Sequence, residues 1–402
     1  MKLKEICEYI SDRVAVSAVS EESYISTENM AQNKGGVTKA SSVPSSGAVI
    51  RYRNNDILIS NIRPYFKKIW QADKAGGCSA DVLCIRAKDH VDSTFLYYLL
   101  SQDTFFEYVM TGAKGCKMPR GDKGHIMDWE IDIPDEKSEQ AAIAQCLKML
   151  DRKIEINKQI NDNLEQQAQA LYKSWFVDFE PFKDGHFVES ELGPIPEGWS
   201  TRKVGELPLY ISDYVSNGSF ASLKENVTLY ETPNYAQFIR NTDLKSSQFS
   251  VWVDQASYNF LAKSKLDGGE IIISNVGDVG SVHLCPKLNI PMTLGNNVIM
   301  VKPTEIVYNY FIYMTYKWFY GKNLIKGITG GSAMPKFNKT DFKSLTLIIP
   351  DNQTLQSFDS IVSHIFEQII NLNSSNQYLS QTRDTLLPKL MSGELKINEI
   401  DC

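Results

Sequence analysis

The 402-residue sequence lacks the features that mark membrane, secreted and metal-binding proteins. No apolar run reaches the roughly 18 residues of a membrane span, and the first residues lack the apolar core of a signal peptide. The seven cysteines include no Cys-x-x-Cys pair, and the five histidines do not have the spacing of metal ligands. These absences argue against a disulfide framework, a zinc site and a membrane anchor, and they favour a protein of the reducing cytoplasm.

Signals of catalysis are also scarce. The sequence contains no glycine-rich phosphate loop ending in Gly-Lys-Ser/Thr and no Gly-x-Ser-x-Gly nucleophile elbow. Gly277–Gly280 follows an apolar strand, but the dinucleotide-binding pattern is incomplete, so we interpret it as a turn. Pro134–Lys137 resembles part of a nuclease motif, yet its position indicates a strand-to-helix junction. We therefore expect no catalytic residue, no metal and no cofactor in this chain.

The clearest positive feature of the sequence is an internal repeat. Tyr9–Val14 matches Tyr210–Val215, and Asp56–Ile62 matches Glu270–Val276. The other matched pairs are Tyr24–Met30 with Phe238–Leu244, Ser79–Ala87 with Gly295–Pro303, Phe95–Leu99 with Phe311–Thr315, Met118–Arg120 with Met334–Lys336, Ile131–Asp135 with Leu347–Asp351, and Gln140 with Gln356. Because these matches keep the same order, they indicate a tandem duplication rather than chance similarity.

Each copy combines short strands with amphipathic helices. Asp56–Ile62 and Glu270–Val276 are apolar, β-branched runs bounded by turn residues, which is typical of buried strands. Ser93–Met110 and Tyr308–Ile325 have the spacing of amphipathic helices, and glycine-rich turns follow both. The pattern predicts an α+β (mixed α/β) fold for each globular domain.

A helical period follows each globular copy. Residues 138–176 contain no glycine or proline, and apolar residues recur there at every third or fourth position. Such a seam is typical of a coiled coil, and the helical stretch after the second copy has a seam of the same kind. Asn157 and Asn161 on the first seam and Asn376 on the second would fix the register. We expect the two helices to pair antiparallel with pseudo-twofold symmetry, and the alternative is that each helix packs on its own domain. The expected seam residues are Leu147, Leu150, Ile154, Leu164 and Leu171 in the first helix and Ile365, Ile369, Leu372, Leu379 and Leu386 in the second.

The repeat and the helices together predict five segments. The stretch from Asp178 to Trp199 is rich in proline and glycine, so we expect it to link the two halves. The predicted segments are a first globular domain at 1–137, a spacer helix at 138–180, a linker at 181–198, a second globular domain at 199–350 and a second spacer helix at 351–395.

The net charge of −6 would by itself argue against a nucleic-acid binder, but the charge is unevenly distributed. Residues 1–137 carry −1 and residues 195–350 carry +3, so the acidity lies in the helical and linker segments. Within the globular copies, basic residues cluster among glycines, aromatics and asparagines in matching places, an arrangement that fits DNA contact as well as it fits an ordinary solvated surface. The candidate DNA-binding residues are Arg63, Lys67, Lys68, Lys114, Lys117, Arg120 and Lys123 in the first copy and Lys322, Lys326, Lys336, Lys339 and Lys343 in the second.

This layout resembles the DNA-specificity subunit of type I restriction–modification enzymes. The resemblance rests on Ile133–Phe182, Gly193–Trp199, Gln381–Leu395 and the strand and turn Glu270–Val282, and it covers nearly the whole chain. The central helix and its flanks are the most specific part of the match. One departure is that the Pro-x-Gly-Trp segment before the second domain has no counterpart at Met1–Ile6.

The resemblance implies a function and a set of partners. Each globular part would be a target-recognition domain that reads one half of a bipartite, asymmetric site on double-stranded DNA, and the paired helices would set the spacing. From Leu147 to Trp175 the helix would span about 42 Å at ~1.5 Å per residue, or roughly twelve base pairs of DNA. Two methyltransferase subunits and motor-nuclease subunits would join the chain, which would not be an enzyme, and S-adenosylmethionine, ATP and magnesium would belong to those partners.

Two other functions remain open at this point. A self-contained methyltransferase or nuclease with its own specificity would need a catalytic tetrapeptide of the Asn-Pro-Pro-Tyr type, and the sequence has none. A coiled-coil adaptor without a DNA role would need the helices but not the basic clusters.

Overall fold

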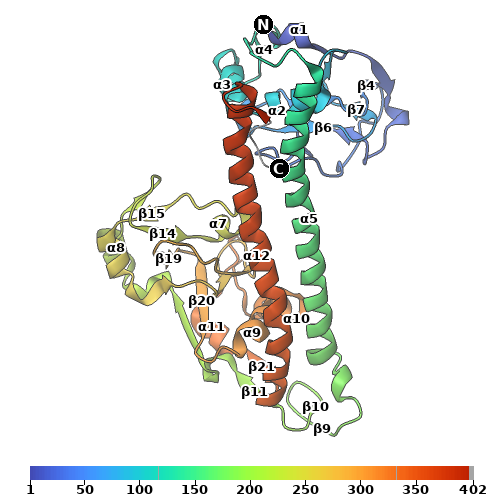
Figure 1. The fold of residues 1–402 in the computed structure, drawn as a ribbon. Helices are drawn as coiled ribbons and strands as arrows, with labels where there is room; N and C mark the ends of the chain where they lie inside the picture. Colours follow the sequence, from blue (N-terminus) through green and yellow to red (C-terminus); the bar gives the residue numbers. More distant parts are fainter. Residues whose placement is uncertain (116, 332, 398–402) are drawn as a thin grey trace. The chain divides into compact units, whose positions relative to one another are not determined.

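The structure is a computed structural model that describes residues 1–115, 117–331 and 333–397 (Figure 1). The chain folds into two compact units. Unit 1 comprises the described residues of Met1–Gln159 and Leu372–Cys402, and unit 2 comprises those of Ile160–Asn371. Each unit therefore contains one globular copy together with a part of both long helices.

Unit 1 contains two four-stranded sheets. The first has the order β1 (Cys7–Tyr9), β8 (Val82–Ala87), β5 (Ile57–Ser60) and β6 (Ile69–Gln71), all antiparallel. The second has the order β2 (Arg13–Ala15), β4 (Ala48–Tyr52), β7 (Gly76–Cys78) and β3 (Tyr24–Ile25), with β3 parallel to β7. The short helices of the unit are α1 (Leu3–Ile6), α2 (Ser93–Leu100), α3 (Asp103–Thr111) and α4 (Lys123–Met127).

Unit 2 repeats this architecture with a larger second sheet. Its first sheet has the order β12 (Leu209–Asp213), β20 (Val298–Pro303), β17 (Ile271–Ser274) and β18 (Val282–Leu284). Its second has the order β13 (Leu229–Tyr230), β15 (Trp252–Val253), β14 (Ala236–Ile239), β19 (Met292–Leu294) and β16 (Lys265–Leu266). Two small sheets pair β11 (Ser200–Lys203) with β21 (Thr346–Ile349) and β9 (Phe187–Val188) with β10 (Ile195–Pro196). The short helices are α6 (Phe220–Asn226), α7 (Asn241–Ser246), α8 (Gln255–Phe260), α9 (Tyr308–Lys317), α10 (Phe319–Ile328) and α11 (Lys339–Ser344).

The two units confirm the predicted mixed α/β fold and the internal repeat. In the first sheets Ile57 pairs with Ile85, and Ile271 pairs with Val301, so the central strands keep the same neighbours. The parallel pair of β3 with β7 recurs as β14 with β19. Strands β5 and β17 are wholly buried, as their apolar, β-branched sequences predict.

The two amphipathic helices expected at Ser93–Met110 and Tyr308–Ile325 are each broken into two. Gln102 and Trp318 have extended backbone at the breaks, which separate α2 from α3 and α9 from α10. The break in unit 1 lets Phe95 and Phe105, on different helices, enter the same buried core. Periodicity alone could not reveal the break, because both parts keep the helical spacing.

The long helices are α5 (Lys137–Phe176) and α12 (Asn352–Met391). In unit 1 they run antiparallel, because Asp151 binds Arg383 at 2.6 Å and Asn157 donates to Asn376 at 2.8 Å. Tyr98 of α2 donates to the same Asp151 at 2.6 Å. Polar contacts therefore set the register of the helices within this unit.

In unit 2 the helices meet through aromatic side chains instead. Phe358 of α12 lies 4.7 Å from Phe176 of α5 between ring centroids, while Phe366 of α12 stacks on Tyr310 of the short helix α9 at 4.7 Å. Neither Phe358 nor Phe366 belongs to the seam predicted from the sequence. Of that seam, Leu147, Ile154, Leu164 and Ile369 are buried, and Leu150, Leu171, Ile365, Leu372, Leu379 and Leu386 are half-buried.

Each long helix pairs with the other one and also packs on a globular copy. Helix pairing and packing on a domain, which were alternatives from the sequence, therefore occur together. Leu147 of α5 lies in the core of unit 1. This contact is expected, because α5 directly follows the first globular copy in the sequence. Leu387, Leu390 and Met391 at the end of α12 lie in the same core, beside the first copy rather than the second. None of the described helices is long and apolar enough to cross a membrane.

Candidate nucleic-acid interface

Three loops of unit 1 meet beyond the end of strand β5. The turn 61–68 contains the short 3-10 helix Pro64–Phe66. The backbone N–H of Arg63 donates to the carbonyl of Pro119 at 2.8 Å, and the N–H of Lys34 donates to the carbonyl of Lys67 at 2.9 Å. We call loops 31–37, 61–68 and 113–121, the last described apart from residue 116, the first loop cluster.

The backbone of unit 2 repeats these contacts. The N–H of Gly277, in the turn 275–281 after β17, donates to the carbonyl of Pro335 at 2.9 Å. A bridge joins Val276 with Lys336, as one joins Ile62 with Arg120 in unit 1. The two clusters are therefore built from equivalent segments.

Helix α7 supplies the third segment in unit 2. Asn241 and Lys245 donate to the carboxylate of Asp278, at 3.0 and 2.9 Å, in the turn after β17. These bonds lower the pKa of Asp278, with the contact to Lys245 as the largest cause. We call segments 240–247, 275–281 and 329–338, the last described apart from residue 332, the second loop cluster.

Both turns have left-handed backbone at each end but use different residues there. The φ angles are 51° at Arg63 and 50° at Lys67, compared with 78° at Gly277 and 81° at Gly280. This conformation disfavours a residue with a Cβ by roughly 1–2 kcal/mol, whereas glycine adopts it freely. The equivalent turn, which is one residue longer in the first copy, is therefore strained there and relaxed in the second copy.

Carboxylates neutralise several cations of the first cluster. Asp103 binds Lys67 at 2.9 Å and Lys34 at 3.1 Å, and although burial opposes it, these bonds hold the pKa of Asp103 below its ordinary value. Lys114 binds Asp122 at 2.7 Å, and this contact is the main reason that the pKa of Asp122 falls to about 2. Such pairs fix side chains in place and reduce the positive charge presented to solvent.

Helix α10 brings further cations to the second cluster. A Cβ at Gly280 would lie 3.6 Å from the side chain of Ile325, so α10 packs directly on the turn. Lys322 and Lys326 on this helix are exposed, as is Lys336. These lysines enter no ion pair with the described residues.

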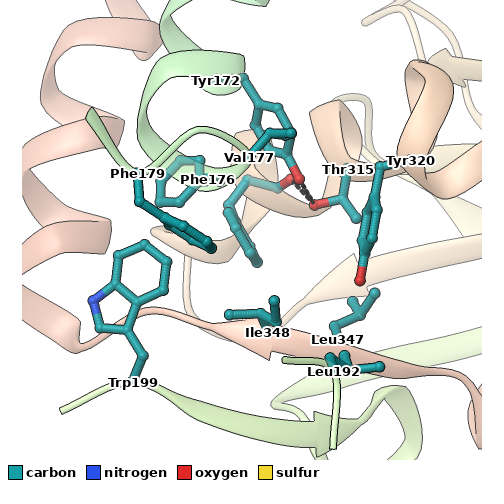
Figure 2. Close-up of a pocket in the computed structure, with 11 residues that line it drawn as sticks. Tyr172, Phe176, Val177, Phe179, Leu192, Trp199, Thr315, Tyr320, Leu347 and Ile348 are labelled. Carbon is teal, nitrogen blue, oxygen red and sulfur yellow. Dashed lines mark hydrogen bonds between the residues drawn. The ribbon is translucent and has the colours of Figure 1, made fainter. Parts of the chain in front are cut away.

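A small cavity lies at the end of α5 in unit 2, apart from the second loop cluster (Figure 2). Its volume is about 190 Å³, and aromatic residues such as Phe176, Phe179 and Trp199 line it. Tyr172 and Thr315 form a hydrogen bond of 2.9 Å on its wall. In the part of the chain that the structure describes, no group of three or more metal-binding side chains occurs.

Comparison with known proteins identifies the family of the chain that carries these two loop clusters. The family model of the type I restriction–modification DNA specificity domain matches residues 1–166 and 196–381. The chain belongs to this family. It is a specificity subunit of a type I restriction–modification system, as the sequence resemblance implies.

Individual relatives agree with this assignment. The type I restriction enzyme MjaIX specificity subunit of Methanocaldococcus jannaschii is 31% identical over 78% of this chain and 71% of its own length. The HindI specificity subunit of Haemophilus influenzae is 25% identical over 98% of both chains. The solved S subunit from M. genitalium has the same fold, with a TM-score of 0.56, 17% identity, and coverage of 97% of this chain and 95% of that one.

Most of the predicted DNA-binding residues of the specificity subunit lie in the loop clusters. Those in the first cluster are Arg63, Lys67, Lys68, Lys114, Lys117 and Arg120, and those in or beside the second are Lys322, Lys326 and Lys336. Arg120 binds Asp81 at 3.1 Å, and Lys68 donates to the carbonyl of Thr27 at 2.6 Å. The structure thus brings together two basic stretches that are about 50 residues apart in the sequence.

Three of the predicted residues of the specificity subunit have other surroundings. Lys123 begins α4 and lies over the ring of Tyr9, 5.7 Å from its centroid. Lys339 binds the carboxylate of Asp213 at 3.1 Å on the edge strand β12. Lys343 lies against Gly205 at the start of the second domain.

Sequence reasoning missed several residues of the clusters. Asn241 and Lys245 contact Asp278, and Lys34 supports the turn at Lys67. Their only signal was position, because Asn241 lies within the matched segment Phe238–Leu244, Lys245 follows that segment directly, and Lys34 lies shortly after its partner Tyr24–Met30.

His283 was also missed and lies beneath the second cluster. Burial, with smaller contributions from neighbouring lysines, lowers its pKa to about 4. Its Nε2 shares a hydrogen bond of 2.9 Å with the hydroxyl of Ser281. The ring is therefore neutral near pH 7 and supports the turn without adding charge.

Proposed function

We propose that this specificity subunit recognises a bipartite, asymmetric site on double-stranded DNA, with one half-site bound by each globular domain. The observation that supports the proposal is the pair of loop clusters, which share the backbone contacts between two of their three segments and differ in their side chains. A shared backbone would orient both domains on DNA in the same way, whereas different side chains would read different bases. The two half-sites are therefore expected to differ in sequence.

The chain is proposed to recognise DNA without catalysing a reaction. The relatives from M. jannaschii and H. influenzae are named as specificity subunits of restriction enzymes, which supports an assembly with other subunits. In this proposal two methyltransferase subunits and motor-nuclease subunits carry the chemistry, and they hold S-adenosylmethionine, ATP and magnesium. Clear binding of S-adenosylmethionine by the purified chain alone, measured by calorimetry, would contradict this division of roles.

Methylome sequencing tests the recognition role directly. The chain is expressed with its methyltransferase partner in a host that lacks other DNA methyltransferases, and modified bases are mapped across the genome. We expect one bipartite motif with two different half-sites. The control is the same strain without the specificity gene. Sequence-independent modification, or none, would favour a coiled-coil adaptor without a DNA role.

The two long helices are proposed to set the distance between the half-sites. Each is a continuous helix of 40 residues, and each unit contains part of both. The length of a helix increases by about 1.5 Å with every residue that it contains. The spacer in the DNA motif would then depend on helix length rather than on the loops.

Lengthening both helices together is expected to lengthen the DNA spacer. Four helix-forming residues are inserted after Gln159 in α5 and four after Asn371 in α12, where the two units divide. Each insertion adds about one turn, or ~6 Å, which corresponds to roughly two base pairs. Methylome sequencing should show the same half-sites separated by about two more base pairs.

The control inserts four residues in α5 alone. This variant shifts Asn157 and Asp151 relative to their partners on α12 or forces the added turn to bulge, so it should lose activity. An unchanged spacer in an active double insertion would rule out the helices as the ruler.

A further inference from the structure

The first loop cluster keeps two side chains at positions where the second cluster uses glycine. Arg63 corresponds to Gly277, because their N–H groups donate to the equivalent carbonyls of Pro119 and Pro335. Lys67 corresponds to Gly280 at the other end of the turn. All four residues have left-handed backbone, which favours glycine.

The strain at Arg63 is not required by the fold. Gly277 shows that glycine fits the first position of the equivalent turn in unit 2, which is one residue shorter, and a Cβ added there would meet nothing within 4 Å. A non-glycine residue held in this conformation therefore points to a role for its side chain. The side chain of Lys67 already has such a role, since it binds Asp103.

The guanidinium of Arg63 has a different environment from its basic neighbours. Lys67, Lys114 and Arg120 each bind a carboxylate. Arg63 forms no ion pair with the described residues, and its Nε is buried without an acceptor among them. Its guanidinium carbon instead lies 5.9 Å from the centroid of the Phe66 ring, which holds the side chain through a cation–π contact.

We propose that Arg63 is a base-reading residue of the first domain and that it contacts a guanine in the half-site of that domain. The assignment rests on the proposed DNA-recognition function. A guanidinium presents two parallel N–H donors that match the O6 and N7 acceptors of guanine in the major groove. Because Gly277 has no side chain, the second domain lacks this contact, and the two half-sites differ at the corresponding position.

The test replaces Arg63 with glycine in the full chain bound to its methyltransferase partner. Arg63→Gly relieves the left-handed strain, so the thermal unfolding temperature should be unchanged or higher. Its methylome should keep one half-site and the spacer but accept other bases at one position of the other half-site. In competition binding with duplexes based on the wild-type motif, discrimination at that guanine should fall about 5- to 150-fold.

Two further variants make the result specific. Arg63→Lys keeps the charge but not the paired donors, and it should relax the same position. Asn55→Gly also replaces a left-handed residue of unit 1, at φ 70°, outside the first loop cluster, and it should leave the motif unchanged.

Each failure has a separate meaning. An Arg63→Gly motif identical to the wild type, a uniform loss of affinity for all sequences, or a half-site without a guanine would overturn the assignment of Arg63 alone. Misfolding of Arg63→Gly would overturn the argument that glycine suits this backbone. A wild-type complex without any bipartite motif would overturn the proposed function and this inference with it.

Discussion

Replacing Phe358 with alanine is expected to lower the free energy of unfolding of unit 2 by about 3–5 kcal/mol. The side chain is fully buried and lies within an aromatic cluster, with ring centroids 4.7 Å from Phe176 and 5.9 Å from Trp175. It joins the start of α12 to the end of α5. Alanine would remove this contact and leave a cavity that the surrounding rings cannot fill without moving.

Urea unfolding followed by circular dichroism would measure this loss as a lower midpoint. Hydrogen exchange would locate it, because amides of α9 and the end of α5 should exchange faster. Phe220→Ala is the matched control, since Phe220 also belongs to unit 2 and is 81% exposed. Its free energy of unfolding should change by less than about 0.5 kcal/mol. An unchanged midpoint for Phe358→Ala would mean that the helices are not held together by this cluster.

Removing three lysines from the second loop cluster is expected to weaken DNA binding by about 100- to 1000-fold. Lys322, Lys326 and Lys336 are exposed and enter no ion pair with the described residues, so their charges are available to phosphates. Each charge-assisted bond that is lost reduces affinity about tenfold. The salt dependence should change too, because each lysine that contacts a phosphate contributes about 0.9 to the slope of log K against log salt.

Binding of the triple alanine variant in complex with the methyltransferase partner is measured on the wild-type target duplex over a range of salt concentrations. The control replaces Lys203, Lys224 and Lys263, which are exposed in the same domain but outside the cluster. The control removes the same charge from the domain, so it should lose little affinity and keep the slope. Equal losses in both variants would show that net charge, rather than the second loop cluster, drives binding.

Local patterns in the sequence identified the elements of this protein well. Strands β5 and β17 follow from short apolar, β-branched runs, and α5 follows from a long helical period without glycine or proline. Such signals depend on neighbours a few residues apart, so they are visible in one chain. The breaks at Gln102 and Trp318 were not visible, because the helices on both sides of each break keep the helical spacing.

The candidate site could be predicted only in part for the same reason. Charge clustering identified most of the basic residues, but their ion pairs depend on carboxylates such as Asp81 and Asp103 from other segments. The left-handed backbone of Arg63 is accompanied by a hydrogen bond from its own N–H to the carbonyl of Pro119, more than 50 residues later. Residue type alone does not separate a paired cation from an available one.

The sequence by itself determined the duplication, the mixed α/β class, the two long helices and the family, because each rests on a pattern that repeats along the chain. Only the tertiary structure decided which segments meet. It placed the end of α12 in the core of the first copy, through Leu387, Leu390 and Met391. It also showed that one turn is built with arginine and lysine in one copy and with glycine in the other. The physical reason is that burial and backbone conformation depend on contacts between residues far apart in the chain, which periodicity and composition do not record.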